Sequence, residues 1–439
     1  MISPRRLALW VSDTFGTSPL YKNVRTYYFS HMRNLTLPAL LTAEAVSSTG
    51  SAMTFVALPW FVLVTTGSPT RMSIVLAAEI LPMALFSIPG GSVIARLGAR
   101  RSMLVSDAVR APLIALVPLL HWTGHLTFGL LVVIVFVLGI FMAPYVAAQR
   151  SIIPEVLGDD EKAVAKASGL FGAAQHLPIV IGPPLAGALI GFFGTSPLLV
   201  VDGATFLFAF LVVLVFVRGG RPVAADEESR GVLAGVRYLM RDRLLGPMSL
   251  TIVVLDGAAN GISVAVPLLA YTRYHRDPHV AGWIFTAFGI GAITGSVLVM
   301  KLLDRFAPLK LSSFGIVAAT LPLWVVVAPA GWPVVALAVV LCGLFVPLIN
   351  APLMGIITTR PPVALRAKVM TAVMAASGSG GPLGRLIIGP LYRFGGNAAV
   401  WTEIAGGMSL GALLFIGAVW RASAGDAADL VSVPPVADG

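Results

Sequence analysis

Long apolar runs separated by short polar stretches dominate the chain. About 20 apolar residues are needed for a helix to cross roughly 30 Å of hydrocarbon, and many of the runs reach that length. Strands of a membrane barrel need only about 10 residues and alternate in polarity, which these runs do not. We therefore expect twelve transmembrane helices, at residues 36–65, 71–95, 103–121, 127–148, 164–193, 198–217, 245–271, 280–301, 311–329, 332–356, 368–392 and 398–420.

Composition supports an all-α membrane protein. Of the 439 residues, 57% are hydrophobic and 11% are charged, whereas a soluble domain carries about a quarter charged residues. The 45 glycines and 31 prolines do not argue against helices, because neighbouring membrane helices satisfy the backbone groups that these residues free. We expect lipid, not water, to cover most of the surface.

The net charge of +10 raises the question of nucleic-acid binding, and its distribution answers that question. With a cytoplasmic N-terminus and alternating spans, 24 of the 30 Lys and Arg residues fall on the inner side, four in outer loops and two within spans. The outer four are Arg71, Arg273, Arg276 and Arg393. This positive-inside bias predicts cytoplasmic termini and makes the basic charge a topology signal. We expect membrane lipid as a partner and no nucleic acid.

The longest polar interval divides the spans six and six. We predict a cytoplasmic arm at 1–35, a six-helix bundle at 36–217, a cytoplasmic loop with an interfacial helix at 218–244, a second bundle at 245–420 and a disordered cytoplasmic tail at 421–439. The arm begins with a twin arginine, but the apolar run after it is too short for a signal peptide.

The two halves of the chain contain similar short sequence motifs. "VALPWFV" at 56–62 corresponds to "VAVPLLAY" at 264–271, and "GGSVIARLGARR" at 90–101 corresponds to "TGSVLVMKLLDRFAPLK" at 294–310. Two parallel six-helix repeats, related by an axis along the membrane normal, are the plan of one large class of transporters. In such a protein, the two halves move relative to each other around a central binding site.

These residues resemble the major facilitator superfamily over nearly the whole chain. The stretch at 90–101 is similar to the family signature between helices 2 and 3, G-x-x-x-D-R-x-G-x-R-R, although Ala95 stands where the acid is expected. The phrases "SSTGSAMTFVALPW", "SDAVRA", "VDGATFL" and "GVLAGVRYLMRDRLL" resemble the branch of macrolide-efflux proteins and siderophore exporters. The residues that match the signature in the two halves are Gly91, Arg96, Gly98, Arg100, Arg101, Asp304, Arg305 and Lys310.

In the family, the missing acid helps to hold the inner gate shut. Asp107, with Arg110 three residues later, is the candidate substitute, and we expect the cationic loop at Arg96, Arg100 and Arg101 to stabilise its carboxylate. The alternative is that these arginines only anchor the topology and that Asp304 and Arg305 of the second half carry the gate.

A second family motif lies in the fifth span. Gly182, Pro183 and Gly187 are similar to a motif associated with export by antiport, although Pro178 and Ala186 replace expected glycines. Close packing of helices is the other reason for small residues and prolines here.

Six carboxylates lie within the expected spans, and an ionisable group inside a bilayer is a functional candidate. Asp202 and Glu403 lie within a turn or two of the outer boundary, so we expect their carboxylates to be in contact with water. Glu79 lies about two turns from the outer boundary, and its depth does not decide between a functional role and contact with water. The six are Glu44, Glu79, Asp107, Asp202, Asp256 and Glu403.

Glu44 and Asp256 are set apart because each lies on the first helix of its half, about 12 Å and 17 Å deep at roughly 1.5 Å per residue. The family resemblance implies that these helices line the central cavity, where a buried carboxyl can load and release a proton; a satisfied polar contact between helices is the alternative. Asn260 follows Asp256 by one turn. Further candidates for a relay, a substrate contact or an ion pair are Gln175, His176 and Arg385.

We therefore predict a secondary transporter of a bacterial inner or plasma membrane, a proton-coupled exporter of an amphiphilic drug, antibiotic or siderophore. We expect a monomer without catalytic residues, metal or cofactor. The sequence has no phosphate-binding loop and no protease or hydrolase motif. Its one cysteine, Cys342, cannot form an intrachain disulfide. The alternatives are an importer of a small metabolite and an uncoupled channel or sensor on the same fold.

Overall fold

The computed structural model describes residues 19–157, 161–217, 232–242, 244–362 and 365–431. This part of the chain is helical apart from short turns and contains no strand. The helices are α2 (Pro19–Thr66), α3 (Pro69–Leu97), α4 (Ala99–Trp122), α5 (Phe128–Leu157), α6 (Glu161–Phe193), α7 (Thr195–Phe216), α8 (Val232–Arg241), α9 (Leu245–Arg273), α10 (Pro278–Leu303), α11 (Pro308–Thr320), the 3-10 turn η2 (Leu321–Leu323), α12 (Trp324–Val327), α13 (Trp332–Thr359) and α14 (Arg366–Val431).

Eleven stretches of the described chain are long and apolar enough to cross a bilayer, and the last of them covers 55 residues, Lys368–Ala422. It contains a break, because Gly395 and Gly396 are not helical and Gly396 has a φ of 63°, which glycine adopts without a steric penalty. The break divides this stretch into two spans. The prediction of an all-α membrane protein with twelve spans is thereby confirmed.

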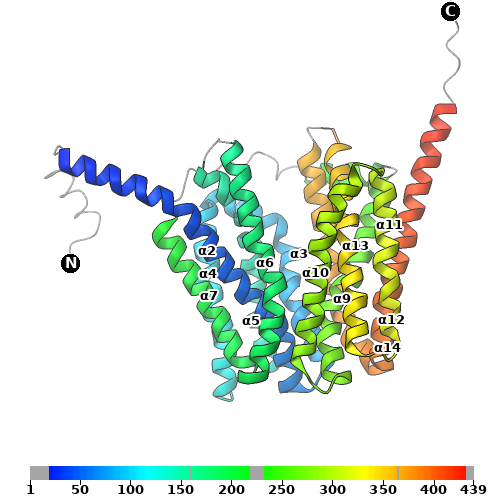
Figure 1. Cartoon of the computed structure of the whole chain (residues 1–439), viewed down its shortest axis with the longest axis horizontal. Helices are drawn as coiled ribbons and strands as arrows, with labels where there is room; N and C mark the ends of the chain where they lie inside the picture. The colour runs from blue at the N-terminus through cyan, green and yellow to red at the C-terminus, as the bar shows by residue number, and fades with distance from the viewer. Residues whose placement is uncertain (1–18, 158–160, 218–231, 243, 363–364, 432–439) are drawn as a thin grey trace, which may run out of the picture.

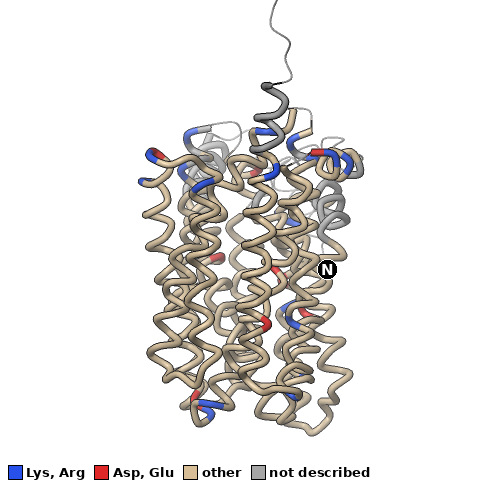
Figure 2. The backbone as a smooth tube through the Cα atoms, turned by 90° about the vertical axis from the view of Figure 1, so that its right-hand side faces the viewer, with Lys and Arg blue, Asp and Glu red and all other residues tan. Residues whose placement is uncertain are grey.

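The helices form two bundles, α2–α7 and α9–α14, which lie side by side (Figure 1). We call them the N-bundle and the C-bundle. Helices α2 and α14 extend from the same end, which we call the terminal face; the turn between α2 and α3 lies at the opposite face. Lys and Arg residues gather at the terminal face, and a few charged residues lie at mid-height (Figure 2).

Two boundaries differ from the sequence prediction. Helix α2 begins at Pro19, so much of the expected arm is a helical extension of the first span. Helix α14 continues to Val431, so residues 421–431 are helical where a disordered tail was expected. The ten-residue helix α8 lies where the interfacial helix was expected, while residues 1–18, 218–231 and 432–439 lie outside the described part.

The bundles meet where glycines remove the bulk between helices. A Cβ built on Gly187 of α6 would lie 2.9 Å from the carbonyl oxygen of Pro278, and one on Gly282 of α10 would lie 2.6 Å from that of Pro183. Real Cβ atoms essentially never come within 3.0 Å, so only glycine allows this approach. The glycine–proline motif of the fifth span therefore builds the seam between α6 and α10.

Aromatic pairs continue the contact between the bundles. Phe55 packs edge-on against Phe285 with ring centroids 5.1 Å apart, and Trp60 packs against Tyr271 at 5.9 Å. Each of these residues lies in the half of its span nearer the opposite face. The seam between α6 and α10 and the two aromatic pairs therefore close the interface between the bundles on that side.

Candidate functional site

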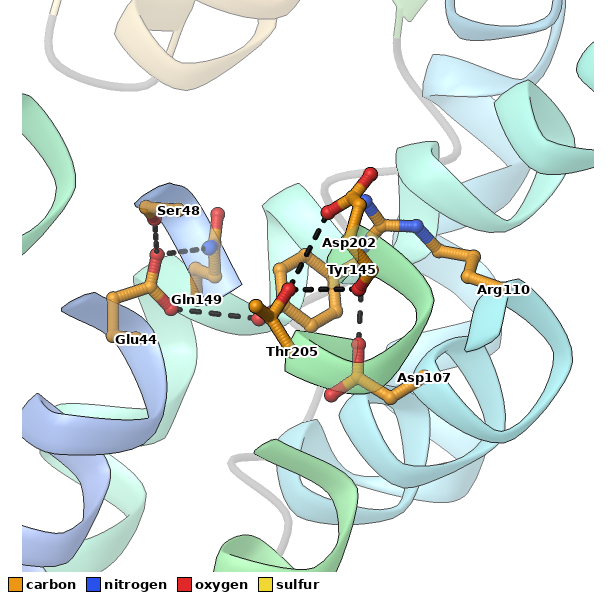
Figure 3. Close-up of polar contacts among 8 residues, drawn as sticks. All are labelled: Glu44, Ser48, Asp107, Arg110, Tyr145, Gln149, Asp202 and Thr205. Atoms are coloured by element: carbon orange, nitrogen blue, oxygen red, sulfur yellow. Dashed lines mark hydrogen bonds and ion pairs between the residues drawn. The ribbon is translucent and has the colours of Figure 1, made fainter. Parts of the chain in front are cut away.

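Glu44 on α2 is buried and is the hub of a polar network in the N-bundle (Figure 3). Its carboxylate accepts hydrogen bonds from Ser48 Oγ at 2.8 Å, Gln149 Nε2 at 2.7 Å and Tyr145 Oη at 3.5 Å. Gln175 of α6 also donates to it. Two helices besides α2 thus hold this acid, since α5 supplies Tyr145 and Gln149 and α6 supplies Gln175.

Asp107 and Arg110 form the second part of this network, one turn apart on α4. Both are buried, and Arg110 Nη1 lies 3.8 Å from Asp107 Oδ1. The guanidinium lies over the ring of Phe206 at 3.9 Å and near that of Tyr145 at 5.0 Å, which adds cation–π stabilisation. Within the described part, Arg110 Nη1 and both carboxylate oxygens of Asp107 have no hydrogen-bond partner.

Asp202 on α7 completes the network, and here the sequence prediction was wrong. It was expected to be in contact with water, but its side chain is buried and accepts a hydrogen bond from Thr54 Oγ1 at 2.7 Å. Thr205 lies 3.4 Å from its other oxygen. Gly50 of α2 makes room for both, because a Cβ there would lie 2.2 Å from Thr205 Oγ1 and 2.6 Å from Asp202 Oδ1.

We refer to Glu44, Asp107, Asp202 and Arg110 as the acid cluster. Three helices, α2, α4 and α7, bring its members together, and the three acids interact electrostatically across Arg110. One guanidinium can balance one carboxylate, and an unbalanced charge inside a protein costs several kcal/mol. The arrangement is therefore chemically suited to holding protons on some of its carboxyls.

A cavity of about 350 Å³ lies next to Glu44, between α5 and α6, in the half of the N-bundle nearer the terminal face. Its lining mixes amides and a hydroxyl with apolar side chains. The two amides are Gln149 and Gln175, the same residues that hold Glu44. The full lining is Val146, Gln149, Ile153, Ser168, Phe171, Gly172 and Gln175.

The structure does not place Asp107 at an inner gate. Its ion-pair partner is Arg110, deep in the bundle, and the loop arginine Arg100 is engaged elsewhere. Arg100 donates to the backbone oxygens of Leu214, at 2.8 Å, and Val217, at the end of α7. Cationic side chains commonly stabilise the last carbonyls of a helix in this way. Among the described side chains, Asp107 is therefore paired with Arg110 of its own helix and not with Arg100; the side chain of Arg96 is not among them.

An acid that the sequence analysis overlooked lies at the end of the signature loop, where α4 begins. Glu155 Oε2 accepts a hydrogen bond from the backbone N–H of Ala99 at 2.8 Å, at the start of α4. Gly98, immediately before it, has a φ of 80°, which explains the glycine at this signature position. Glu155 thus places a negative charge at a helix N-terminus, where it is favoured.

The remaining signature residues do not form a site in the described structure. Arg101, Asp304 and Arg305 are exposed. Gly91 and Arg96 of α3 and His176 of α6 lie within described helices, but their surroundings are outside the described part of the structure.

The C-bundle candidates lie on α9 and on both halves of α14. Asp256 is half-buried, and Asn260 donates to the Asp256 backbone oxygen at 3.0 Å, so these two residues share a face as expected. Arg385 is buried and pairs with Glu79 of the N-bundle at 3.3 Å. Glu403 is half-buried, and its Oε2 has no hydrogen-bond partner in the described part.

Sequence reasoning also missed the neutral partners of the acids: Tyr145, Gln149, Thr54 and Thr205. One signal was available, because Tyr145 and Gln149 are four residues apart, and so on one face, in a span that is otherwise almost entirely apolar. Nothing in the sequence connects Thr54 to Asp202, which lies 148 positions away.

Comparison with known proteins agrees with this architecture. The chain is 27% identical over 385 residues to the multidrug efflux pump Tap of Mycolicibacterium fortuitum, covering 83% of this chain and 91% of that one. It is 20% identical over 261 residues to macrolide efflux protein A of Streptococcus pyogenes, covering 58% and 64% of the two chains. The nucleoside transporter NupG has the same fold, with a TM-score of 0.73 at 14% identity over 88% of this chain and 99% of that one.

A family model described as transmembrane secretion effector matches residues 26–435, nearly the whole chain. This match and the efflux-pump relatives confirm the resemblance to the major facilitator superfamily. The chain is a multi-pass membrane protein and belongs to the transmembrane secretion effector family of that superfamily.

Proposed function

We propose that the protein exports amphiphilic drug-like molecules from a bacterial cytoplasm in exchange for protons. The observation that carries this proposal is the position of Glu44, which belongs to the acid cluster and is hydrogen-bonded to Gln149 and Gln175 of the cavity lining. A molecule in the cavity and a proton on the cluster therefore act on one carboxyl. The efflux-pump relatives support export as the direction of transport.

The positive-inside rule assigns the terminal face to the cytoplasm, since Lys and Arg residues gather there (Figure 2). The seam between α6 and α10 closes the side that then faces outward, and the cavity lies in the half nearer the cytoplasm. This arrangement suits a state that receives substrate from inside. The mixed lining of Gln149, Gln175, Ser168 and Phe171 suits a molecule with an apolar ring and a few hydrogen-bonding groups.

Coupling follows from the charge balance of the acid cluster. When Glu44 is protonated, the cluster loses a charge that Arg110 cannot balance, and the bundle can close around it without water. When Glu44 is ionised, its negative charge behind Gln149 and Gln175 of the lining favours a substrate that brings a positive group or hydrogen-bond donors. Alternate occupancy by a proton and by substrate would make export depend on the proton gradient.

Accumulation of a chemically diverse panel of fluorescent drugs in expressing cells, with and without an uncoupler, tests the proposal. We expect expression to lower accumulation of several amphiphilic compounds and the uncoupler to abolish the difference. Glu44→Gln, which keeps the size but not the titration, should behave like uncoupled cells. Glu403→Gln is the matched control, a half-buried carboxyl outside the acid cluster, and should keep efflux. Unchanged efflux by Glu44→Gln at normal expression would refute the coupling role.

We further propose that one chain is the transporting unit, in the cell membrane, with both termini in the cytoplasm. The energy source is the proton gradient, so the proposal includes no cofactor, no metal and no catalysed reaction. The other uses of the fold differ in the same assay: an importer would raise accumulation, and a channel would give flux that neither saturates nor responds to the proton gradient.

A further inference from the structure

Helices α3 and α14 join the two bundles along a second seam. A Cβ built on Gly389 of α14 would lie 2.5 Å from Thr70 Cα and 2.7 Å from the backbone oxygen of Pro69, so the helices touch at the start of α3. One turn before Gly389, the side chain of Arg385 crosses the seam. This seam lies in the half of the protein nearer the opposite face, the half that must part if a substrate is to leave on that side.

Arg385 is bound to the N-bundle by two contacts. Its Nη1 donates to the backbone oxygen of Leu76 at 3.0 Å and lies 3.3 Å from Glu79 Oε2. The guanidinium is buried, and its Nε has no hydrogen-bond partner in the described part. Separating the bundles would leave a buried charge without its partner, which is costly unless another anion replaces Glu79.

The C-bundle holds such an anion. Asp256 lies on α9 within electrostatic range of Arg385. The residues next to them in sequence, Gly257 and Gly384, are in backbone contact, because a Cβ on Gly384 would lie 1.8 Å from the Gly257 oxygen. Arg385 and Asp256 thus flank the closest approach of α14 to α9, and this contact stays within one bundle when the two bundles move apart.

We propose that Arg385 is a latch that exchanges anions during transport, paired with Glu79 across the seam when the opposite face is closed and with Asp256 within the C-bundle when it is open. The Glu79 pair stabilises the closed state, and the Asp256 pair lowers the free-energy cost of opening. This role concerns the movement of the bundles, so it holds whatever the substrate or coupling ion is.

Thiol accessibility at the seam tests the latch in purified full-length protein. Thr70 Oγ1 is buried at the seam, and Cys342 is the only native cysteine and is also buried. In a Thr70→Cys, Cys342→Ala background, labelling by a small methanethiosulfonate reports parting of α3 from α14. The same charge variants with native Cys342 and Thr70 report unfolding, because Cys342 reacts only when the C-bundle opens up.

We expect Glu79→Gln to speed labelling at position 70 by roughly 5- to 150-fold, the usual range for coupled equilibria. Arg385→Gln should speed it less, because it also removes the pair with Asp256 that stabilises the open state. The double variant should be no faster than the faster single one, because both lose the same contact. Asp256→Asn should slow labelling, since it removes the anion of the open state. Glu403→Gln should match the parent, and Arg385→Lys should stay within a few-fold of it.

Equal labelling of Glu79→Gln and Glu403→Gln would overturn the latch, and so would additive effects of Glu79→Gln and Arg385→Gln. A glutamine variant that exposes Cys342 is unfolded and does not test the latch. In that case the labelling rates of Arg385→Lys and Asp256→Asn provide the test. Failure of Asp256→Asn to slow labelling would overturn the proposal. Labelling needs neither substrate nor a proton gradient, so its result is independent of the transport assay.

Discussion

Replacing Gly50 with alanine should disturb the acid cluster from outside it. The new Cβ would lie 2.2 Å from Thr205 Oγ1 and 2.6 Å from Asp202 Oδ1, whereas ordinary contacts begin at 3.4 Å. Thr205 and Asp202 must therefore shift by roughly 1 Å, and overpacking of this kind costs about 1–3 kcal/mol. Losing the Thr54 hydrogen bond in the process would add about 1–3 kcal/mol, the cost of an unsatisfied buried acceptor.

Thermal unfolding of the purified protein in detergent measures this cost, and drug efflux at several pH values measures its effect on the cluster. Gly169→Ala is the matched control, because it lies in a helix of the same bundle and its Cβ would meet nothing within 4 Å. Alanine there should be neutral or slightly stabilising. Adding Thr205→Ala to Gly50→Ala removes the closest atom and should recover part of the stability. A Gly50→Ala protein as stable and as active as Gly169→Ala would refute this account of Asp202.

Two further predictions concern the ends of helices. Asp242 accepts hydrogen bonds from the first N–H groups of α9 and from Arg360 Nε at 3.1 Å; burial opposes its charge, but these bonds outweigh it and hold its pKa below the ordinary 3.8. Asp242→Asn should therefore cost about 1 kcal/mol above pH 4, and the difference from the parent should vanish as pH falls through the lowered pKa, as measured by unfolding. Arg100→Gln should raise amide hydrogen exchange at the end of α7 around Leu214, while the exposed Arg101→Gln should not.

The apolar runs were sufficient to predict the twelve spans, because the length of an apolar run is set by the bilayer. They were weaker at the ends of the chain, where α2 begins at Pro19 and α14 continues to Val431. No apolar requirement applies outside the bilayer, so helix propensity there leaves only a faint pattern.

Position along a span gives the depth of a residue but not the direction in which it points. Glu44 was correctly selected as a buried acid of the first helix. Asp202, at a depth that suggested contact with water, is buried because α7 turns it toward Thr54 of α2. That rotation depends on the packing of helices far apart in sequence. For the same reason, the pairing of Arg385 with Glu79 rather than with a substrate required the structure.

Ala95 stands where the signature has its acid, and Asp107 was the substitute predicted from the sequence. Asp107 was the nearest carboxyl in sequence, but it lies deep in the bundle with Arg110. Glu155, which reaches the start of α4, lies 56 residues away from its partner Ala99 along the chain. Contacts between helix ends depend on how the helices are arranged in space, and a single sequence does not contain that arrangement.

Proton movement in proteoliposomes tests the central claim most directly. Purified protein would be reconstituted with a pH dye inside, and ethidium, a fluorescent lipophilic cation, would be added with and without an imposed pH gradient. The account predicts ethidium accumulation that requires the gradient, proton flux that requires ethidium, loss of both in Glu44→Gln and retention of both in Glu403→Gln. Ethidium movement of equal rate and extent without a gradient, or gradient-driven accumulation that survives Glu44→Gln, would contradict it.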